Sequence, residues 1–132
     1  MERQTISSGT EYEAIAGYSR ALRLGDVVHV SGTTATDGAN AVVGIGDSAA
    51  QTDFIIRKIE RALQKAGAQL SDVVRTRVYL APQADWEAVA RVHGKYFGAI
   101  RPANTLLYVQ ALVGEDYLVE IEAEAIVTSA AK

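Results

Sequence analysis

Residues 119–125 read Val119-Glu120-Ile121-Glu122-Ala123-Glu124-Ala125, and this stretch decides how the chain is organised. Side chains along a β-strand alternate between its two faces, so the three glutamates project to one side and the apolar residues to the other. The apolar side suits a hydrophobic core. Three aligned carboxylates repel one another unless something pairs or separates them. The acidic side is therefore either a functional surface or a solvated strand face.

The rest of the chain predicts two helices among further strands. Ser48 and Gln51 have the spacing of a capping box and Gly67 that of a helix end, so we expect a helix between them. Asp85 should cap a second helix, whose expected inward residues are Trp86, Val89, His93, Tyr96 and Phe97. We expect strands at residues 18–24, 27–31, 42–43, 73–81, 106–112 and 118–127. This order predicts an α+β fold, a mixed six-stranded sheet with two helices packed on one face.

The strand expected at residues 106–112 carries apolar residues in both of its alternating sets. A sheet with one face exposed to solvent would carry apolar residues in only one of these two sets. With both helices on one face, no further segment is left to cover the other. We therefore expect other copies of the protein to cover it in a closed, symmetric oligomer.

Composition narrows the possible functions. The 132 residues fit one domain, 1–132, and the net charge of −3 mildly repels nucleic acid. The absence of cysteine excludes disulfides, thiolate metal sites and cysteine nucleophiles. The polar start and the lack of a long apolar run predict a cytoplasmic protein with no membrane partner. Basic residues of the first helix lie mostly off its apolar stripe, so we interpret them as a solvated face: Arg57, Lys58, Arg61 and Lys65.

Metals and cofactors are not expected. His29 and His93 are the only histidines and lack the spacing of a metal site, so His93 is interpreted as a satisfied core or interface residue. No dinucleotide fingerprint or complete phosphate loop occurs, and no nucleophile elbow surrounds a serine. We therefore predict no metal and no cofactor.

Several short motifs follow one another in a characteristic order: Gly17-Tyr18-Ser19, Val30-Ser31-Gly32, Ala66-Gly67, residues 72–80, Asp85-Trp86, Arg101-Pro102-Ala103-Asn104 and residues 119–125. Together they resemble the Rid (YjgF) family, the reactive-intermediate imine/enamine deaminases. The resemblance runs from about Gly17 to Val127. It implies a chorismate-mutase-like fold and a homotrimer with small-molecule clefts between subunits.

The resemblance also implies site residues. Tyr18 and Ser31 fall on a tyrosine and a serine that line the family's cleft, and Glu120 falls on the glutamate that positions or activates the hydrolytic water. Asn104 takes the place of the family's arginine, which grips the substrate carboxylate. A neutral amide does not replace a charged guanidinium fork. Ala90 and Leu106 also depart from the family pattern.

Two other arginines could supply the missing charge. Arg101 lies three residues before Asn104, and Arg20 lies two residues after Tyr18. Pro102 intervenes between Arg101 and Asn104, and strand alternation alone does not place Arg20. Both are retained as candidates, and Asn104 is expected to hydrogen-bond a neutral or carbonyl group of the ligand.

Each candidate residue also has a structural alternative. Glu120 is either a general base whose proton affinity is raised by its acidic neighbours, or a strand residue paired with Arg75 or Arg77. Tyr18 either donates to a ligand or is a half-buried strand residue. Ser31 either presents a hydroxyl or ends a strand.

The sequence thus supports three functions. The first is hydrolysis or tautomerisation of an imine, enamine or related unsaturated metabolite, with weak or no activity on amino-acid-derived imines because of Asn104. The second is a non-catalytic metabolite-binding or interaction module. The third is the endoribonuclease or translation-inhibitor activity attached to the family's name, which the acidic balance and the lack of a histidine pair disfavour.

Overall fold

The computed structural model describes residues 1–128, in which six strands form one mixed sheet. The strands are β1 (Arg3–Ile6), β2 (Ala21–Leu24), β3 (Val27–Thr33), β4 (Val73–Leu80), β5 (Ala103–Tyr108) and β6 (Val119–Ile126). Their order across the sheet is β1-β2-β3-β6-β4-β5. Only β4 and β5 are parallel; the other neighbours are antiparallel.

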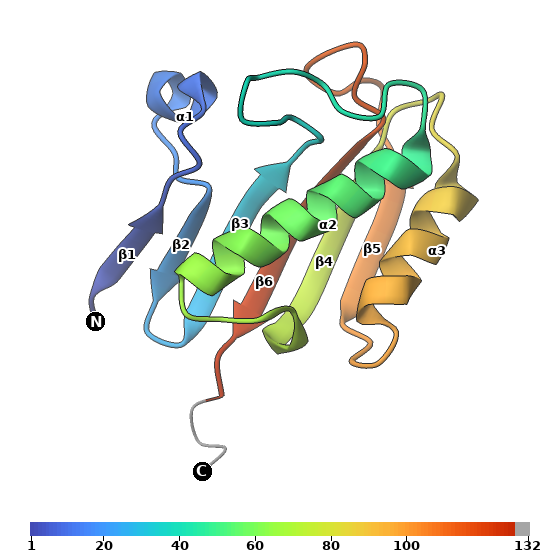
Figure 1. Cartoon of the computed structure of the whole chain (residues 1–132). Coiled ribbons are helices and arrows are strands. Elements are labelled where there is room, and N and C mark those ends of the chain that lie inside the picture. The colour runs from blue at the N-terminus through green and yellow to red at the C-terminus, as the bar shows by residue number, and fades with distance from the viewer. Residues whose placement is uncertain (129–132) are drawn as a thin grey trace.

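Two long helices, α2 (Ser48–Lys65) and α3 (Trp86–Phe97), lie side by side across one face of this sheet (Figure 1). A short helix, α1 (Glu11–Ala16), lies near one end of β1 and β2, and a 3-10 turn (Leu70–Asp72) precedes β4. This arrangement is the predicted α+β fold.

The core lies between α2, α3 and the centre of the sheet. Strand β6 runs between β3 and β4, and its apolar residues Val119, Ile121, Ala123 and Ala125 are all buried. Buried isoleucines of α2, among them Ile55 and Ile59, belong to the same cluster. Each large aliphatic side chain that is fully buried contributes about 1.5–3 kcal/mol. The alternation in residues 119–125 therefore anchors the middle of the sheet, as the sequence indicates.

The start of α2 differs from the prediction. Asp47 is the cap, because its carboxylate accepts a hydrogen bond from the Ala50 N–H at 3.0 Å. Ser48 instead turns inward, and its Oγ accepts from the Asp85 N–H at 3.0 Å. Gln51 is fully buried, and its side chain bonds the Asp116 carbonyl at 2.9 Å and the Leu118 N–H at 2.8 Å. The two residues expected to form a capping box thus hold neighbouring loops.

The predicted strand at residues 42–43 is wrong. That segment forms only an isolated bridge between Thr36 and Val42, in a loop where Asp37 accepts hydrogen bonds from two backbone N–H groups. The sixth strand is β1, whose first three residues are exposed, so that it shows no apolar alternation. Helix α1 has six residues and gives no periodic pattern.

Two details further along also differ. Strand β5 begins at Ala103 and ends at Tyr108 instead of spanning residues 106–112. Trp86, expected to point inward, is 53% exposed, whereas Val89 and Phe97 of the same helix are buried. Trp86 directly follows the cap Asp85 in the first turn of α3, where residues 85–87 are all exposed, and the buried side of the helix begins at Val89.

Candidate active site

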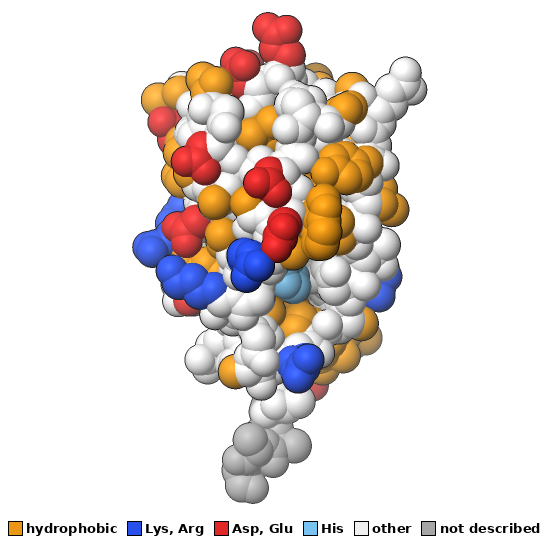
Figure 2. All heavy atoms as spheres, turned by 90° about the vertical axis from the view of Figure 1, so that its right-hand side faces the viewer, with side chains coloured by type: hydrophobic (Ala, Val, Ile, Leu, Met, Phe, Trp, Pro, Cys, Tyr) orange, Lys and Arg blue, Asp and Glu red, His pale blue; other side chains and the backbone are white. Residues whose placement is uncertain are grey.

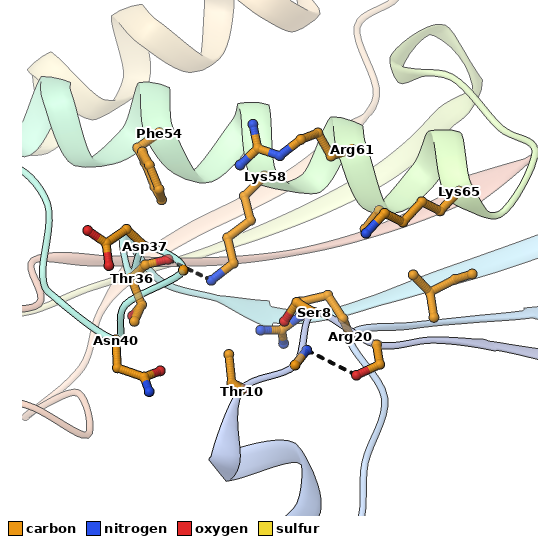
Figure 3. Close-up of a pocket in the computed structure, with 15 residues that line it drawn as sticks. Ser8, Thr10, Arg20, Thr36, Asp37, Asn40, Phe54, Lys58, Arg61 and Lys65 are labelled. Carbon is orange, nitrogen blue, oxygen red and sulfur yellow. Dashed lines mark hydrogen bonds between the residues drawn. The ribbon is translucent and has the colours of Figure 1, made fainter.

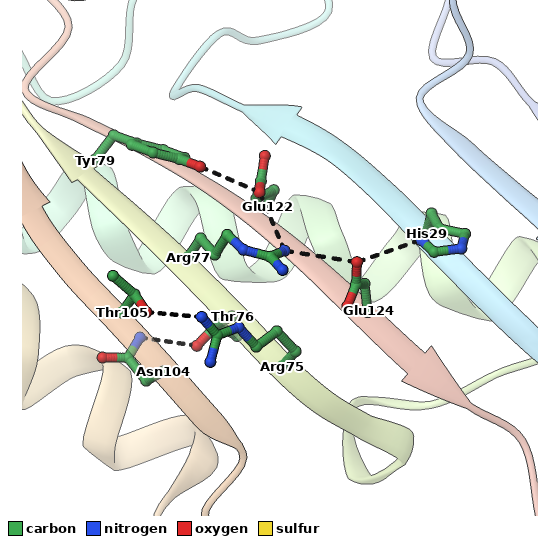
Figure 4. A network of polar contacts seen from close by, with 9 residues as sticks. All are labelled: His29, Arg75, Thr76, Arg77, Tyr79, Asn104, Thr105, Glu122 and Glu124. Atoms are coloured by element: carbon green, nitrogen blue, oxygen red, sulfur yellow. Dashed lines mark hydrogen bonds and ion pairs between the residues drawn. The ribbon is translucent and has the colours of Figure 1, made fainter.

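Glu120 stands alone among the three carboxylates of β6. Arg77 Nη1 lies 3.2 Å from Glu122 and 3.5 Å from Glu124, and the Tyr79 hydroxyl donates to Glu122 at 3.2 Å (Figure 4). His29 lies 3.5 Å from Glu124. Within residues 1–128, Glu120 forms no ion pair.

The alternative in which Glu120 pairs with Arg75 or Arg77 is therefore wrong. Arg77 is occupied by the other two glutamates, and Arg75 donates to the Thr105 hydroxyl at 2.7 Å. The aligned carboxylates therefore differ in their partners: Glu122 and Glu124 share the single charge of Arg77, and Glu120 has no ion-pair partner among residues 1–128.

A bulge in β3 sets the surroundings of Glu120. The pairing of β3 with β6 is regular up to Val30 opposite Ala123 and resumes at Thr33 opposite Ile121, so two residues of β3 face one residue of β6. Gly32, within this bulge, packs directly under the Glu120 side chain. A Cβ atom at Gly32 would collide with the Glu120 carboxylate.

Burial raises the pKa of Glu120 above its ordinary value. The positive charge of Arg20 opposes this effect, and the negative charge of Glu122 adds to it. The glutamate therefore holds a proton more readily than a solvated one, which suits a group that accepts and returns protons near neutral pH.

Glu120 opens into a cavity of about 270 Å³, which we call the Glu120 cavity. Its wall is mostly apolar and comes from α1, the segment before β2, the end of β3 and the loop after it, α2 and the loop before β6. Besides Glu120, its lining residues include Tyr18, Arg20, Lys58, Ile15 and Val113.

Arg20 is the main cation of this cavity. It is 5% exposed, and its Nη2 donates to the Gly32 carbonyl at 2.6 Å. Its guanidinium carbon lies 5.6 Å from the centre of the Tyr18 ring, a cation–π distance. Among the described residues its Nε has no hydrogen-bond partner. A buried donor without a partner is costly, so a ligand oxygen here would be bound favourably.

The structure brings only some of the predicted residues together. Tyr18 lines the same cavity as Glu120 and Arg20 and is 40% exposed. Ser31 lies next to the cavity, beside His29 and Glu122, and its hydroxyl donates to the Ser19 carbonyl at 2.7 Å. The Ser31 hydroxyl is thus already engaged within the chain.

Asn104 and Arg101 lie elsewhere. The Asn104 amide donates to the Thr76 hydroxyl at 2.9 Å, and this hydroxyl lies 2.8 Å from His93 Nε2 of α3, on the helix side of the sheet (Figure 4). Arg101 precedes Ala103, which pairs with Arg75 at the level of Glu124. Glu120 is four residues away along β6, or about 13 Å. A single chain therefore does not join Asn104 or Arg101 to Glu120.

Lys58 also lines the Glu120 cavity, which its place among the basic residues of α2 does not predict. Instead of lying on a solvated face, it is half-buried, and its ammonium donates to the Thr36 carbonyl at 3.0 Å. Burial, followed by the nearby charge of Arg20, lowers the pKa of Lys58 to about 8. Its spacing in the sequence could have indicated this burial, because Lys58 is four residues from both Phe54 and Ala62 and so shares their face of the helix.

Within residues 1–128, no three acidic or histidine side chains converge in a way that could hold a metal ion. No helix in this part of the chain combines the length and apolar character needed to cross a membrane. Seen from the side of β5 and α3, acidic, basic and hydrophobic side chains are interspersed (Figure 2). On this side, Lys and Arg side chains gather near the left edge of the view, with acidic side chains beside them (Figure 2).

A family model and a curated relative each match most of this chain. The model of the family described as Endoribonuclease L-PSP matches residues 8–127. The 3-aminoacrylate deaminase RutC of Acinetobacter baylyi is 38% identical over 111 residues, which are 84% of this chain and 87% of that protein.

Solved structures agree with this match. A YjgF/YER057c/UK114 family member from Mycobacterium tuberculosis is 47% identical, with a TM-score of 0.86 over 96% of this chain and 100% of that one. A Rid family protein from Yersinia pestis, YyfA, is 26% identical, with a TM-score of 0.83 over 96% of this chain and 100% of that one. The family match over nearly the whole chain, the identity to RutC and the shared fold agree with the motifs in the sequence, and the chain belongs to the Rid (YjgF) family.

Proposed function

We propose that the protein hydrolyses or tautomerises a small imine, enamine or related unsaturated metabolite in the Glu120 cavity. The observation that carries this proposal is the Glu120 carboxylate, half-buried and free of ion pairs in the described chain, beside the buried cation of Arg20. The identity to a relative named 3-aminoacrylate deaminase supports this substrate class.

The chemistry requires a group that both takes and gives a proton. Protonated Glu120 gives its proton to the enamine carbon, which forms an iminium; water then adds to the C=N carbon while the Glu120 carboxylate accepts a proton from that water. Return of this proton to nitrogen lets ammonia leave, and the hydroxyl proton passes to Glu120 as the carbonyl forms, which restores the starting acid. Burial holds the pKa of Glu120 above its usual range, which brings proton release and return closer to working pH.

The other groups of the cavity orient the ligand. Tyr18 presents its phenol at the wall, and Arg20 places a permanent charge where a ligand carboxylate can be held. We expect weak activity on amino-acid-derived imines. Asn104 offers no charge to their carboxylate, and the Arg20 guanidinium already donates a hydrogen bond to the Gly32 carbonyl. Ser31, Asn104 and Arg101 could reach the ligand only by rearrangement or from a neighbouring copy.

A homotrimer forms part of this proposal. Leu107 of β5 is 40% exposed on a sheet whose long helices cover only the other face. Ile15 and Val113, at the wall of the Glu120 cavity, are 79% and 87% exposed. A neighbouring subunit would cover these apolar side chains and close the cavity into a cleft.

The experiment is a turnover assay with the protein as it stands. 3-Aminoacrylate and imines made in situ by an amino-acid oxidase are supplied, and ammonia release is followed. We expect release from 3-aminoacrylate above the buffer rate, and a smaller effect on the amino-acid imines. Glu120→Gln keeps the size of the side chain but removes the proton acceptor, so turnover should fall by roughly 10²–10⁴. Equal rates for wild type and variant would overturn the catalytic assignment.

The second candidate is a binding module without turnover. It is favoured by the mostly apolar wall of the Glu120 cavity and by the departure at Asn104 from the family's charged grip. A ligand that raises the melting temperature but is not converted, with Glu120→Gln leaving binding intact, would support it. We do not propose ribonuclease activity, because neither histidine lines this cavity.

A further inference from the structure

A second cavity of about 210 Å³ adjoins the Glu120 cavity. It lies between α2 and two loops, residues 6–10 and 36–40 (Figure 3). The two cavities share four wall residues: Thr10, Arg20, Thr36 and Lys58. Its other side is formed by the following two turns of α2, which carry Arg61 and Lys65. We call this cavity the basic pocket.

The basic pocket concentrates positive charge in an acidic protein. Four of its lining residues are cations, Arg20, Lys58, Arg61 and Lys65, and Asp37 is the one acidic residue among them. The whole chain, by contrast, has 16 acidic against 13 basic residues. Such a local excess inside a concave wall raises the concentration of anions there.

These cations are not neutralised within the chain. Among residues 1–128, none of Lys58, Arg61 and Lys65 forms an ion pair. The Asp37 carboxylate accepts hydrogen bonds from the N–H groups of its own loop.

Glu13, a further carboxylate near Lys58, is also engaged. It accepts hydrogen bonds from the hydroxyls of Ser7, Ser8 and Thr10. Lys58 donates to one carbonyl, which leaves two of its three ammonium protons for a ligand. The pocket thus holds free donors as well as charge.

We propose that the basic pocket binds the phosphate group of a small metabolite. A carboxylate would balance only one of the surrounding cations, whereas a phosphate brings close to two negative charges and three strong acceptor oxygens. The cavity is smaller than the roughly 300–1,000 Å³ of drug-sized sites, so it fits a headgroup or a small phosphate ester. The proposal does not depend on the proposed reaction at Glu120, although the two cavities meet at Arg20 and Lys58.

The test measures binding of inorganic phosphate and of glycerol phosphate by calorimetry, at constant ionic strength set with potassium chloride. The double variant Arg61→Gln with Lys65→Gln removes two cations from exposed positions of α2. The control, Arg91→Gln with Lys95→Gln, removes two exposed cations from α3, outside the pocket. We expect wild type and control to bind alike and the α2 variant to bind about tenfold or more weakly.

Further variants and ligands distinguish the remaining outcomes. The charge-preserving pair Arg61→Lys with Lys65→Arg should retain binding, which separates loss of charge from loss of structure. Glycerol phosphate binding without inorganic phosphate binding would assign the site to an ester, and the reverse to the free ion. No binding to wild type, equal loss in both glutamine variants, or binding of a short single-stranded RNA alone would overturn the proposal.

Discussion

At the scale of single residues, the three carboxylates of β6 differ because their neighbours differ. Glu120, Glu122 and Glu124 share one face of β6, yet Arg77 contacts only the latter two. A charge-assisted hydrogen bond holds a carboxylate in its ionised form, whereas burial without a partner favours the protonated form. Glu120 is the carboxylate whose pKa burial raises.

Glu122→Gln is the matched comparison for Glu120→Gln. Glu122 accepts from Arg77 and Tyr79, so losing its charge should cost about 0.5–1.5 kcal/mol of unfolding free energy. Turnover should stay within about tenfold of wild type, since Glu122 does not line the Glu120 cavity. Urea denaturation and the ammonia assay measure the two effects. Equal loss of turnover in both variants would make Glu120 no more catalytic than its neighbour.

Lys58 makes stability depend on pH. Its pKa is lowered to about 8 in the fold from 10.5, so between these values the unfolded chain binds a proton that the folded chain lacks. Stability from this residue therefore rises as pH increases from about 8 towards 10.5. Arg20 and Arg61 lower this pKa further, whereas Glu13 and Asp37 oppose the shift.

Lys58→Met tests this expectation. The unfolding free energy of wild type relative to the variant should increase between pH 7.5 and pH 10, because only wild type carries the titrating group. Urea denaturation at the two pH values gives the difference. A constant difference across this range would mean that Lys58 titrates as an ordinary solvated lysine.

At the scale of elements, the bulge in β3 sets Gly32 against the Glu120 side chain of β6. A regular β3–β6 ladder would set one residue of β3 against each residue of β6, but here Ser31 and Gly32 together face Glu122. Bulges re-aim side chains and often occur beside active sites. The absence of a side chain at Gly32 is what leaves room for the Glu120 carboxylate.

Gly32→Ala should therefore displace Glu120 without unfolding the protein. The new Cβ meets the far end of a flexible side chain, and the backbone of Gly32 is not left-handed, so stability should change little. Turnover should fall at least tenfold, because the proton acceptor is moved. Gly38→Ala is the control, since a Cβ there meets open space. Unchanged turnover in Gly32→Ala would show that the position of Glu120 does not matter.

At the scale of the whole molecule, the sheet is covered by long helices on one face only (Figure 1). Leu106 of β5 packs against the core under α3, while its neighbour Leu107 stays 40% exposed. A strand with apolar residues on both faces predicts that its second face is buried as well, and we expect a neighbouring copy to cover it.

Light scattering at micromolar concentration should give a mass about three times the 14.1 kDa of one chain. Leu107→Glu should shift this mass towards the monomer, because a charge would be buried in the interface. Ile45→Glu, at a 64% exposed position in the loop before α2, should leave the trimer intact. A wild-type monomer would contradict the trimer and the closed cleft.

The sequence alone determined the fold class and the family. Alternation in residues 119–125 and helical spacing from Ser48 to Lys65 are local patterns, set by the period of each element, and both elements form where expected. The sequence did not predict strand β1 or helix α1. Strand β1 is short and mostly polar and pairs with β2, which is distant in the sequence, while α1 has only six residues and too few turns to show a helical period.

Only the tertiary structure decided which side chains meet. The bulge places Glu120 over Gly32, the turn before β2 buries Arg20 beside it, and α2 carries Lys58 to the same wall. The same packing turns Asn104 towards Thr76 and away from Glu120. Strand register and helix packing are long-range contacts between segments far apart in the chain. Local periodicity places a residue on a face of its own element, but which residues meet across elements depends on how those elements pack.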